Sequence, residues 1–183
     1  MLTKEMHKPD VEKELEGKGD FVKIDYLNRY LKLMPPMEMR KFAHLKLVEI
    51  YEKKKMFSEL ASAYRNAANN STIFREKVEF YGEEAKAHVK KLDFIEADKA
   101  IKRAAAEGTK AQVMEMIEGV RNFYKEYAIE LEKQLKRNQA SKIYEKLLKM
   151  NIPLEEKEEI KAKLKNLYEK LGKTNEIKWL EGI

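Results

Sequence analysis

The side chains able to do chemistry are numerous in this sequence but do not gather into a recognisable site. There are three histidines and no cysteine, which excludes disulfides, cysteine-ligated zinc and a cysteine nucleophile. Glu84 and His88 are four residues apart, a spacing that puts two potential metal ligands on one helical face. A metal site needs at least a third ligand, and none is apparent in the sequence. We therefore predict no metal and no cofactor.

Carboxylate pairs occur as Glu83-Glu84, Glu155-Glu156 and Glu158-Glu159. General acid–base catalysis needs two carboxylates that face one cleft with separated pKa values, but adjacent residues on a helix point about 100° apart. These pairs are typical of solvated faces and, after Pro153, of acids at a helix start. The segment Gly17-Lys18-Gly19-Asp20 lacks the earlier glycine and the following Ser or Thr of a phosphate-binding loop. We predict no catalytic residue and no enzyme activity.

Charge is plentiful and evenly spread along the chain. Charged residues make up 38% of the 183 residues, and the net charge is +6. Residues 1–40 are neutral overall, and residues 130–183 carry +3. Surfaces that bind nucleic acid usually cluster their basic residues, so the even spread argues against a nucleic-acid partner. A nucleic-acid-associated or regulatory helical module that uses the basic excess remains the alternative.

No stretch reaches the roughly 18 apolar residues of a membrane span, and residues 1–18 lack the apolar centre of a signal peptide. We therefore predict a cytoplasmic protein without membrane insertion. Lysine and glutamate are enriched, which is typical of thermophilic proteins and equally of helix-rich proteins in general. Both interpretations stay open.

Apolar residues recur every three or four positions, which is the period of an amphipathic helix. Phe42, Leu45, Val48 and Tyr51 form one such stripe. Seven glycines and four prolines are too few for a fold built on β-hairpins. Gly119 falls inside the longest stripe, where we expect a kink. We predict an all-α chain of about ten helices, at residues 5–17, 20–33, 37–54, 57–69, 73–91, 93–107, 109–136, 138–150, 153–171 and 174–182.

The expected helices form pairs that repeat. A small or aliphatic residue early in the second helix of each pair recurs at intervals of 36, 37, 43 and 37 residues, at Ile24, Leu60, Ala97, Ala140 and Ile177. Four residues later come Asn28, Tyr64, Ile101 and Tyr144. A single pair cannot bury its apolar stripe alone, so neighbouring pairs must stack. We predict one domain over 1–183, with units at about 5–36, 37–72, 73–108, 109–152 and 153–183.

This pattern resembles the tetratricopeptide repeat (TPR) family, whose unit is a pair of antiparallel helices. The first helix of that unit carries a bulky residue, a leucine, a small residue and a tyrosine, at spacings of three, one and three. His44, Leu47, Val48 and Tyr51 occupy these places in the best unit. The other units follow more loosely, at Tyr81, Glu84, Ala85 and His88, at Tyr124, Tyr127, Ala128 and Leu131, and at Lys161, Leu164, Lys165 and Tyr168.

The resemblance implies a right-handed α-α superhelix that mediates protein–protein interaction. The units are longer than the 34 residues of that family, which is similar to the soluble NSF attachment protein (SNAP) branch of helical-repeat adaptors. A non-repetitive helical bundle is the alternative. The leading hypothesis is a non-catalytic scaffold or adaptor that binds a protein or peptide in a concave groove.

In TPR-like arrays the first helix of each pair lines the concave surface. The resemblance therefore predicts a groove formed by Phe42, Leu45, Glu49, Glu79, Lys86, Asn122, Lys125, Ile129, Ala162 and Asn166. Asn122 and Lys125 suggest the clamp by which one TPR subgroup holds a terminal carboxylate. The matching asparagine of that clamp is replaced by Ile129 here, and by Lys86 and Glu49 in preceding units. A terminal carboxylate is therefore not the predicted ligand.

The last expected helix carries apolar side chains at Ile177, Trp179, Leu180 and Ile183. Repeat arrays need a polar cap over the final apolar face, and this helix is the last in the sequence. Either Trp179 packs inward and acts as the cap, or Ile177, Trp179 and Leu180 form an exposed patch. Such a patch would support a homodimer or the docking of a partner.

Overall fold

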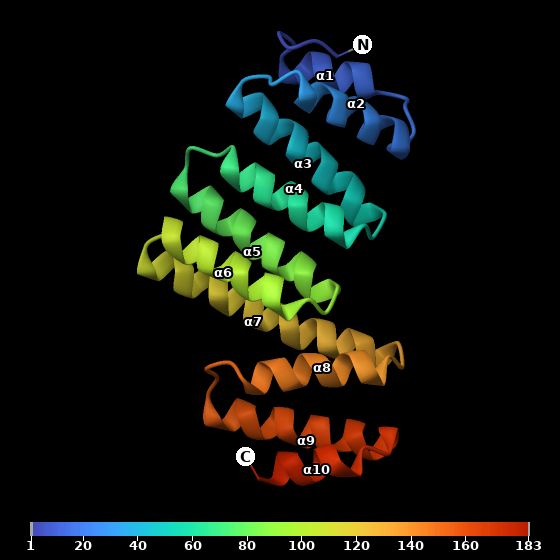
Figure 1. Cartoon of the computed structure of the whole chain (residues 1–183), viewed down its shortest axis with the longest axis vertical. Helices are drawn as coiled ribbons and strands as arrows, with labels where there is room; N and C mark the ends of the chain where they lie inside the picture. The colour runs from blue at the N-terminus through green and yellow to red at the C-terminus, as the bar shows by residue number, and fades with distance from the viewer. Residues whose placement is uncertain (1, 183) are drawn as a thin grey trace. The chain divides into compact units, whose positions relative to one another are not determined.

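The computed structural model describes residues 2–182, apart from the side chain of Glu181, and consists of helices joined by turns (Figure 1). The helices are α1 (Lys8–Leu15), α2 (Asp20–Lys32), α3 (Met37–Lys53), α4 (Phe57–Asn69), α5 (Phe74–Lys90), α6 (Phe94–Glu107), α7 (Lys110–Lys133), α8 (Arg137–Leu148), α9 (Leu154–Leu171) and α10 (Thr174–Glu181). No strand occurs within residues 2–182. The predicted all-α fold is confirmed. None of the helices in this range is long and apolar enough to cross a membrane.

Helix ends follow the local chemistry of the sequence. Asp93 caps α6, because its Oδ1 accepts a hydrogen bond from the Glu96 backbone N–H at 3.2 Å. The first helix begins at Lys8, later than predicted. The Asp10 carboxylate accepts a hydrogen bond from the His7 backbone N–H at 3.1 Å, which satisfies a free donor at that point and marks the helix start.

The chain divides into two compact units, Met1–Ile117 and Glu118–Ile183. The first unit holds α1 to α6 and the beginning of α7, and the second holds the rest of α7 and α8 to α10. The division falls two residues before Gly119, and α7 is one continuous helix across it. The single domain over 1–183 stays a prediction.

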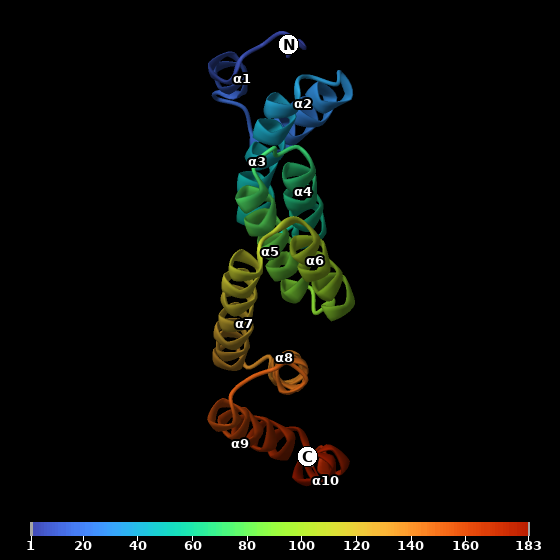
Figure 2. The same cartoon turned by 90° about the vertical axis from the view of Figure 1, so that its left-hand side faces the viewer.

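Successive helices pack against one another inside each unit. In the first unit α2 packs on α3, α3 on α4, α4 on α5 and α5 on α6. Figure 2 shows α1, α3 and α5 on one side of this unit and α2, α4 and α6 on the other. In the second unit α8 packs on α9 and α9 on α10. Each unit is therefore built from helices that pair with their sequence neighbours.

The turn inside the helix pairs has a recurring backbone geometry. A residue in the left-handed region follows α3, α5, α7 and α9, namely Lys55 (φ 57°), Leu92 (φ 61°), Leu135 (φ 59°) and Gly172 (φ 68°). The next residue donates its N–H to the carbonyl five positions earlier, as from Met56 to Tyr51 and from Lys136 to Leu131, both at 2.8 Å. The intervals of 37, 43 and 37 residues equal those of the sequence pattern. The period is therefore present in the backbone as well.

The predicted repeat positions are buried most completely in the middle of the sequence. Leu60, Ala97 and Ala140 are buried, whereas Ile24 and Ile177 are half-buried. Alanine at these positions leaves little side-chain volume between neighbouring helices, so the backbones can approach closely. The small residues of the sequence pattern therefore mark where helices pack.

Candidate functional site

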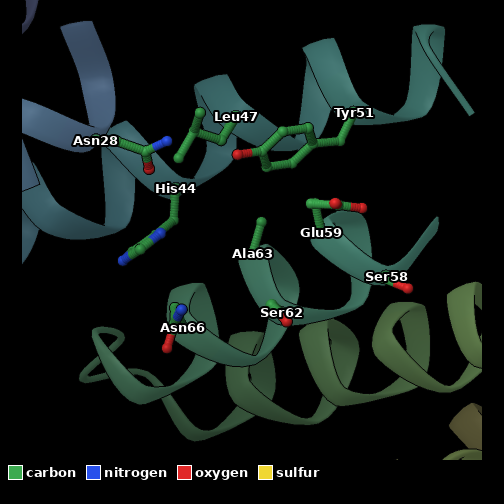
Figure 3. Close-up of a pocket in the computed structure, with 9 residues that line it drawn as sticks. All are labelled: Asn28, His44, Leu47, Tyr51, Ser58, Glu59, Ser62, Ala63 and Asn66. Atoms are coloured by element: carbon green, nitrogen blue, oxygen red, sulfur yellow. The ribbon is translucent and has the colours of Figure 1, made fainter. Parts of the chain in front are cut away.

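A polar pocket opens in the first unit between α2, α3 and α4 (Figure 3). Its volume is about 360 Å³, which lies within the range of ligand-binding clefts. Helix α3 contributes His44, Leu47 and Tyr51, which are called the floor below, and α2 and α4 contribute the other lining residues. The lining residues are Asn28, His44, Leu47, Tyr51, Ser58, Glu59, Ser62, Ala63 and Asn66.

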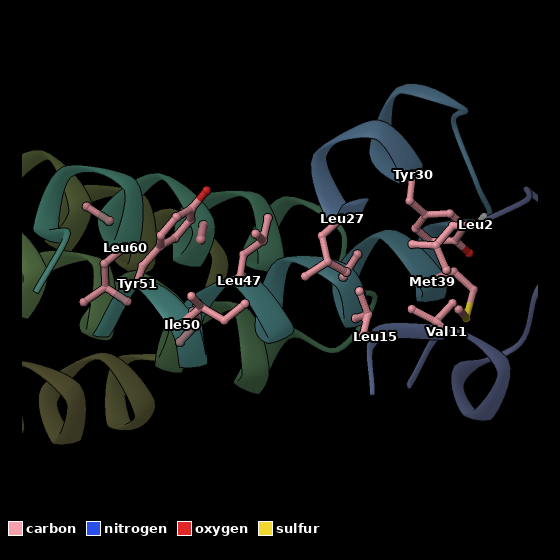
Figure 4. Packing of buried hydrophobic residues seen from close by; sticks show 14 of the residues in the cluster. Leu2, Val11, Leu15, Leu27, Tyr30, Met39, Leu47, Ile50, Tyr51 and Leu60 are labelled. Carbon is pink, nitrogen blue, oxygen red and sulfur yellow. The ribbon is translucent and has the colours of Figure 1, made fainter. Parts of the chain in front are cut away.

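Helix geometry explains why His44, Leu47 and Tyr51 share the floor. They are three and four residues apart on α3, so they lie on one face. Leu47 and Tyr51 are buried and belong to the hydrophobic core of the first unit, together with Leu27 and Leu60 (Figure 4). The pocket is therefore backed by a packed core.

His44 is uncharged at neutral pH. Burial, helped by the positive charge of Arg40, lowers the pKa of His44 from its usual 6.5 to about 4. Arg40 precedes His44 by one turn of α3, on the same face. A neutral imidazole offers one donor and one acceptor nitrogen. His44 can therefore pair with either half of a peptide group.

Several polar groups around the pocket are not engaged inside the protein. The side chains of Asn28, Glu59 and Asn66 are exposed, and none of them hydrogen bonds or pairs with another residue in the described range. Figure 3 shows Asn28, His44 and Asn66 toward one end of the pocket and Glu59 toward the other. Each asparagine amide offers both donors and an acceptor. The pocket can therefore hydrogen bond a peptide backbone and attract a positive charge.

The pocket lies on the other side of α3 from the predicted groove. Phe42 and Leu45 each precede a floor residue, His44 and Leu47, by two positions. Two positions on a helix are about 200° apart. Phe42 and Leu45 are half-buried. None of the pocket residues is among those predicted for the groove.

The sequence analysis did not predict the pocket, although the residue type at Asn28 indicates it. The equivalent second-helix positions hold Tyr64, Ile101 and Tyr144, which are bulky. A small amide in place of a large side chain leaves a volume unfilled. A small polar residue at a position that is otherwise bulky therefore indicates an unfilled volume at that point of the sequence pattern.

The remaining groove residues of the first unit have different surroundings. Glu49 lines a second cavity of about 440 Å³, between α1, α2 and α3. Glu79 pairs with Arg75 at 3.2 Å, and Lys86 pairs with Glu83 at 2.6 Å. Both pairs lie within α5, so these charges are already neutralised along their own helix.

In the second unit, Asn122, Lys125 and Ile129 follow one another along α7. Lys125 bridges to Glu156 of α9 at 2.8 Å, and Ile129 is half-exposed. Asn122 is exposed, as are the α9 residues Ala162 and Asn166. The groove as a whole stays a prediction.

Glu84 and His88 lie in a buried ion cluster. Glu84 is fully buried on α5, and its Oε1 accepts hydrogen bonds from Arg65 Nε of α4 and Arg103 Nη2 of α6, both at 2.6 Å. His88 Nε2 lies 3.7 Å from the same oxygen. Arg65 also reaches Glu96 Oε2 at 3.7 Å. Two guanidinium groups therefore compensate the buried carboxylate and connect three helices.

Helix α10 turns Leu180 inward and leaves Trp179 half-exposed. Leu180 is 4% exposed and Trp179 is 44% exposed, and Ile177 is half-buried. The expectation that Trp179 packs inward as the cap is therefore corrected. Successive residues point about 100° apart, so only one of the two faces the core. Ile183 lies outside the described residues, and an exposed docking patch stays a prediction for Trp179.

Comparison with protein-family models, with curated proteins and with solved structures found no match. The function proposed below therefore rests on the pocket and on the recurring turns of this chain.

Proposed function

We propose that this protein is a non-catalytic helical-repeat scaffold that captures an extended segment of another protein. The pocket between α2, α3 and α4 is the proposed binding site. The observation that carries the proposal is an open polar pocket where the next repeat has a bulky side chain, Asn28 against Tyr64. The TPR-like right-handed superhelix, the adaptor role and the cytoplasmic location belong to the same proposal.

Peptide capture fits the chemistry of the pocket. Every residue of an extended peptide exposes one N–H and one C=O. Asn28 and Asn66 each offer donors and an acceptor across the pocket, and neutral His44 adds one of each. The packed floor of Leu47 and Tyr51 limits the ordering cost of binding, because the site exists before the peptide arrives.

Nucleic-acid binding is the weaker candidate. The first unit has 23 basic and 20 acidic residues, and the second has 15 and 12. Lysines also pair with acids on neighbouring helices, as Lys41 does with Glu76 at 2.7 Å and Lys46 with Glu12 at 2.9 Å. Such pairing lowers the positive potential that phosphate contacts need.

A pair of matched variants tests the proposal. Random peptides displayed on phage are selected on the purified protein, and the dissociation constants of the winners are measured by fluorescence anisotropy. One double variant, Asn28→Ala with Asn66→Ala, alters the pocket. The other, Asn122→Ala with Asn166→Ala, alters the predicted groove, and all four side chains are exposed, so folding should be retained.

We expect the pocket variant to weaken binding by about tenfold, which corresponds to two lost hydrogen bonds, and the groove variant to bind like the parent. The reverse result would move the site to the groove. Failure to select any peptide, together with binding of a labelled RNA or DNA duplex that falls steeply with salt, would favour the nucleic-acid alternative.

A homodimer through α10 is a separate prediction. It now depends on Trp179, because Leu180 is buried. Light scattering on Trp179→Ala is the test, and a parent protein that is already monomeric would exclude the homodimer.

A further inference from the structure

The repeat supplies an internal comparison for the pocket. Positions of α3 and α4 recur 37 residues later in α5 and α6, as the left-handed residues Lys55 and Leu92 show. Positions of α2 recur 36 residues later in α4, as with Ile24 and Leu60. The pocket between α2, α3 and α4 therefore has an equivalent place between α4, α5 and α6.

Guanidinium groups occupy that equivalent place. Arg103 stands where the pocket has Asn66; it contacts the face of the Tyr81 ring, with 5.9 Å from Cζ to the centroid, and hydrogen bonds Glu84 at 2.6 Å. Arg65 contacts Glu84 at 2.6 Å and Glu96 at 3.7 Å. The equivalent place thus holds two arginine side chains that contact carboxylates, and one of them, Arg103, also contacts the face of a ring.

The pocket keeps one of the two carboxylates, has Leu47 in place of Glu84, and lacks the cations. Glu59 is the equivalent of Glu96, which pairs with Lys99 at 2.6 Å and with Arg65. Ser62 replaces Lys99 in the pocket. Arg29 replaces Arg65, but its guanidinium pairs with Asp25 on its own helix at 2.9 Å.

Glu59 is consequently left without a cationic partner among the residues that the structure describes. Asn66 is several atoms shorter than Arg103, which leaves side-chain volume in the pocket that Glu59 also lines. An unneutralised carboxylate beside an open polar volume is complementary to a basic side chain.

We propose that this pocket accepts an arginine side chain of the captured segment, with its guanidinium beside Glu59. The inference rests on the proposed peptide capture and names its specificity. The Tyr51 ring also lines the pocket and supplies a face for the planar group, whereas His44, Asn28 and Asn66 at the other end are left for the peptide backbone. Lysine fits less well, because a compact ammonium neither stacks nor bonds in a fork.

The test uses nuclear magnetic resonance titrations of the ¹⁵N-labelled protein. The probes are capped peptides Gly-Ser-X-Ser-Gly in which X is arginine, lysine, glutamate or citrulline, the neutral isostere of arginine. The side-chain amide signals of Asn28 and Asn66 report on the pocket directly. Glu59→Gln removes the charge, and Glu115→Gln on α7 is the matched control, because Glu115 is also exposed and outside the pocket.

We expect the arginine peptide to bind about threefold to fivefold more tightly than the citrulline peptide, as for an exposed ion pair. Glu59→Gln should abolish the difference, and Glu115→Gln should preserve it. The lysine peptide should lie between the two, and the glutamate peptide should bind most weakly.

Two results separate this inference from the proposed function. Equal shifts of the Asn28 and Asn66 signals by the arginine and citrulline peptides would overturn the arginine specificity and leave peptide capture standing. An absence of shifts with these probes and with peptides selected from a random library would overturn both.

Discussion

The pocket of α2, α3 and α4 and the ion cluster of α4, α5 and α6 occupy positions that are 36 or 37 residues apart along the chain. The turns that precede α4 and α6 have the same geometry, with Lys55 at φ 57° and Leu92 at φ 61°. The pocket is open, with about 360 Å³ of free volume. In its counterpart, Arg65 and Arg103 both hydrogen bond Glu84, which is fully buried.

The difference lies in side chains rather than in the backbone. Seven of the nine lining positions hold different residues in the two places: Asn28 for Tyr64, His44 for Tyr81, Leu47 for Glu84, Tyr51 for His88, Ser58 for Ile95, Ser62 for Lys99 and Asn66 for Arg103. Except for Tyr51, each of these pocket residues is smaller or carries less charge than its counterpart. Under the proposed function, the pocket binds a peptide because it lacks the bulk and the ionic partners of the ion cluster.

The largest loss of stability is expected when Glu84 of the ion cluster is replaced by leucine, the residue type of Leu47 in the pocket. Glu84→Leu leaves Arg65 and Arg103 without their carboxylate. Removal of one partner from a buried ion pair costs about 3–5 kcal/mol. The two arginine side chains are 38% and 31% exposed, so water can compensate them partly, and we expect a loss near the lower end, about 3 kcal/mol. Urea unfolding measures it.

Glu83→Leu is the matched control for that substitution. Glu83 is the neighbouring residue and only pairs with Lys86 along the helix surface, so its loss should cost less than about 0.5 kcal/mol. A Glu84→Leu protein that also carries Arg65→Ala and Arg103→Asn should regain much of its stability. Equal losses for the two glutamates would contradict the role given to the cluster.

The second prediction concerns the pH dependence of stability, to which His44 of the pocket contributes and the equivalent Tyr81 does not. The folded protein keeps His44 neutral down to about pH 4, whereas the unfolded chain takes up a proton near 6.5. Stability should therefore fall as pH drops from about 6.5 to 4, by about 2 kcal/mol after allowance for partial solvent access. The equivalent Tyr81 has no charge change in this range.

Thermal or urea unfolding of the parent and of His44→Tyr across this range measures the difference between them. Carboxylates such as Asp20, whose pKa is lowered below 3.8 by hydrogen bonds from Lys53 and Lys54, lose their contribution at lower pH and do so in both proteins. Parallel pH profiles for the two proteins would show that burial does not hold His44 neutral.

The third prediction concerns a substitution that makes the pocket more like the ion cluster. Asn28→Tyr installs the side chain of Tyr64 at its equivalent position and should occupy the pocket volume. We expect peptide affinity to fall by at least about tenfold, or 1.4 kcal/mol, with little change in stability because Asn28 is exposed. Asn122→Tyr on α7 is the control, and anisotropy with a selected peptide is the measurement. Unaltered affinity would place the bound peptide elsewhere.

The helices and their period could be predicted from the sequence because both are local properties. Apolar spacing defines each helical face, and the recurring small residues, such as Ala97 and Ala140, mark where helices meet. The pocket could not be predicted in the same way. It depends on which faces of α2, α3 and α4 converge, and the family resemblance pointed to the other side of α3.

The expectation that Trp179 packs inward was wrong for a similar reason. Whether Trp179 or its neighbour Leu180 faces inward depends on a rotation of about 100°, and the sequence analysis considered only Trp179 for the inward position. A helix as short as α10, with eight residues, has too few apolar positions to define its buried face from the pattern alone. The long helices, by contrast, repeat their pattern often enough to specify it.

The smallest effect tests whether the two repeats share their backbone. A non-glycine residue in the left-handed region costs about 1 kcal/mol, and Lys55 is exposed. Lys55→Gly should therefore stabilise the protein by about 0.5 kcal/mol after the entropy of the unfolded glycine is counted. Leu92→Gly gains the same backbone relief but loses a half-buried side chain, so it should be close to neutral.

Lys54→Gly is the control, because its φ of −86° suits any residue and glycine there should only destabilise. If Lys55→Gly and Lys54→Gly lowered the urea midpoint alike, the shared turn, and with it the equivalence of pocket and cluster, would be refuted.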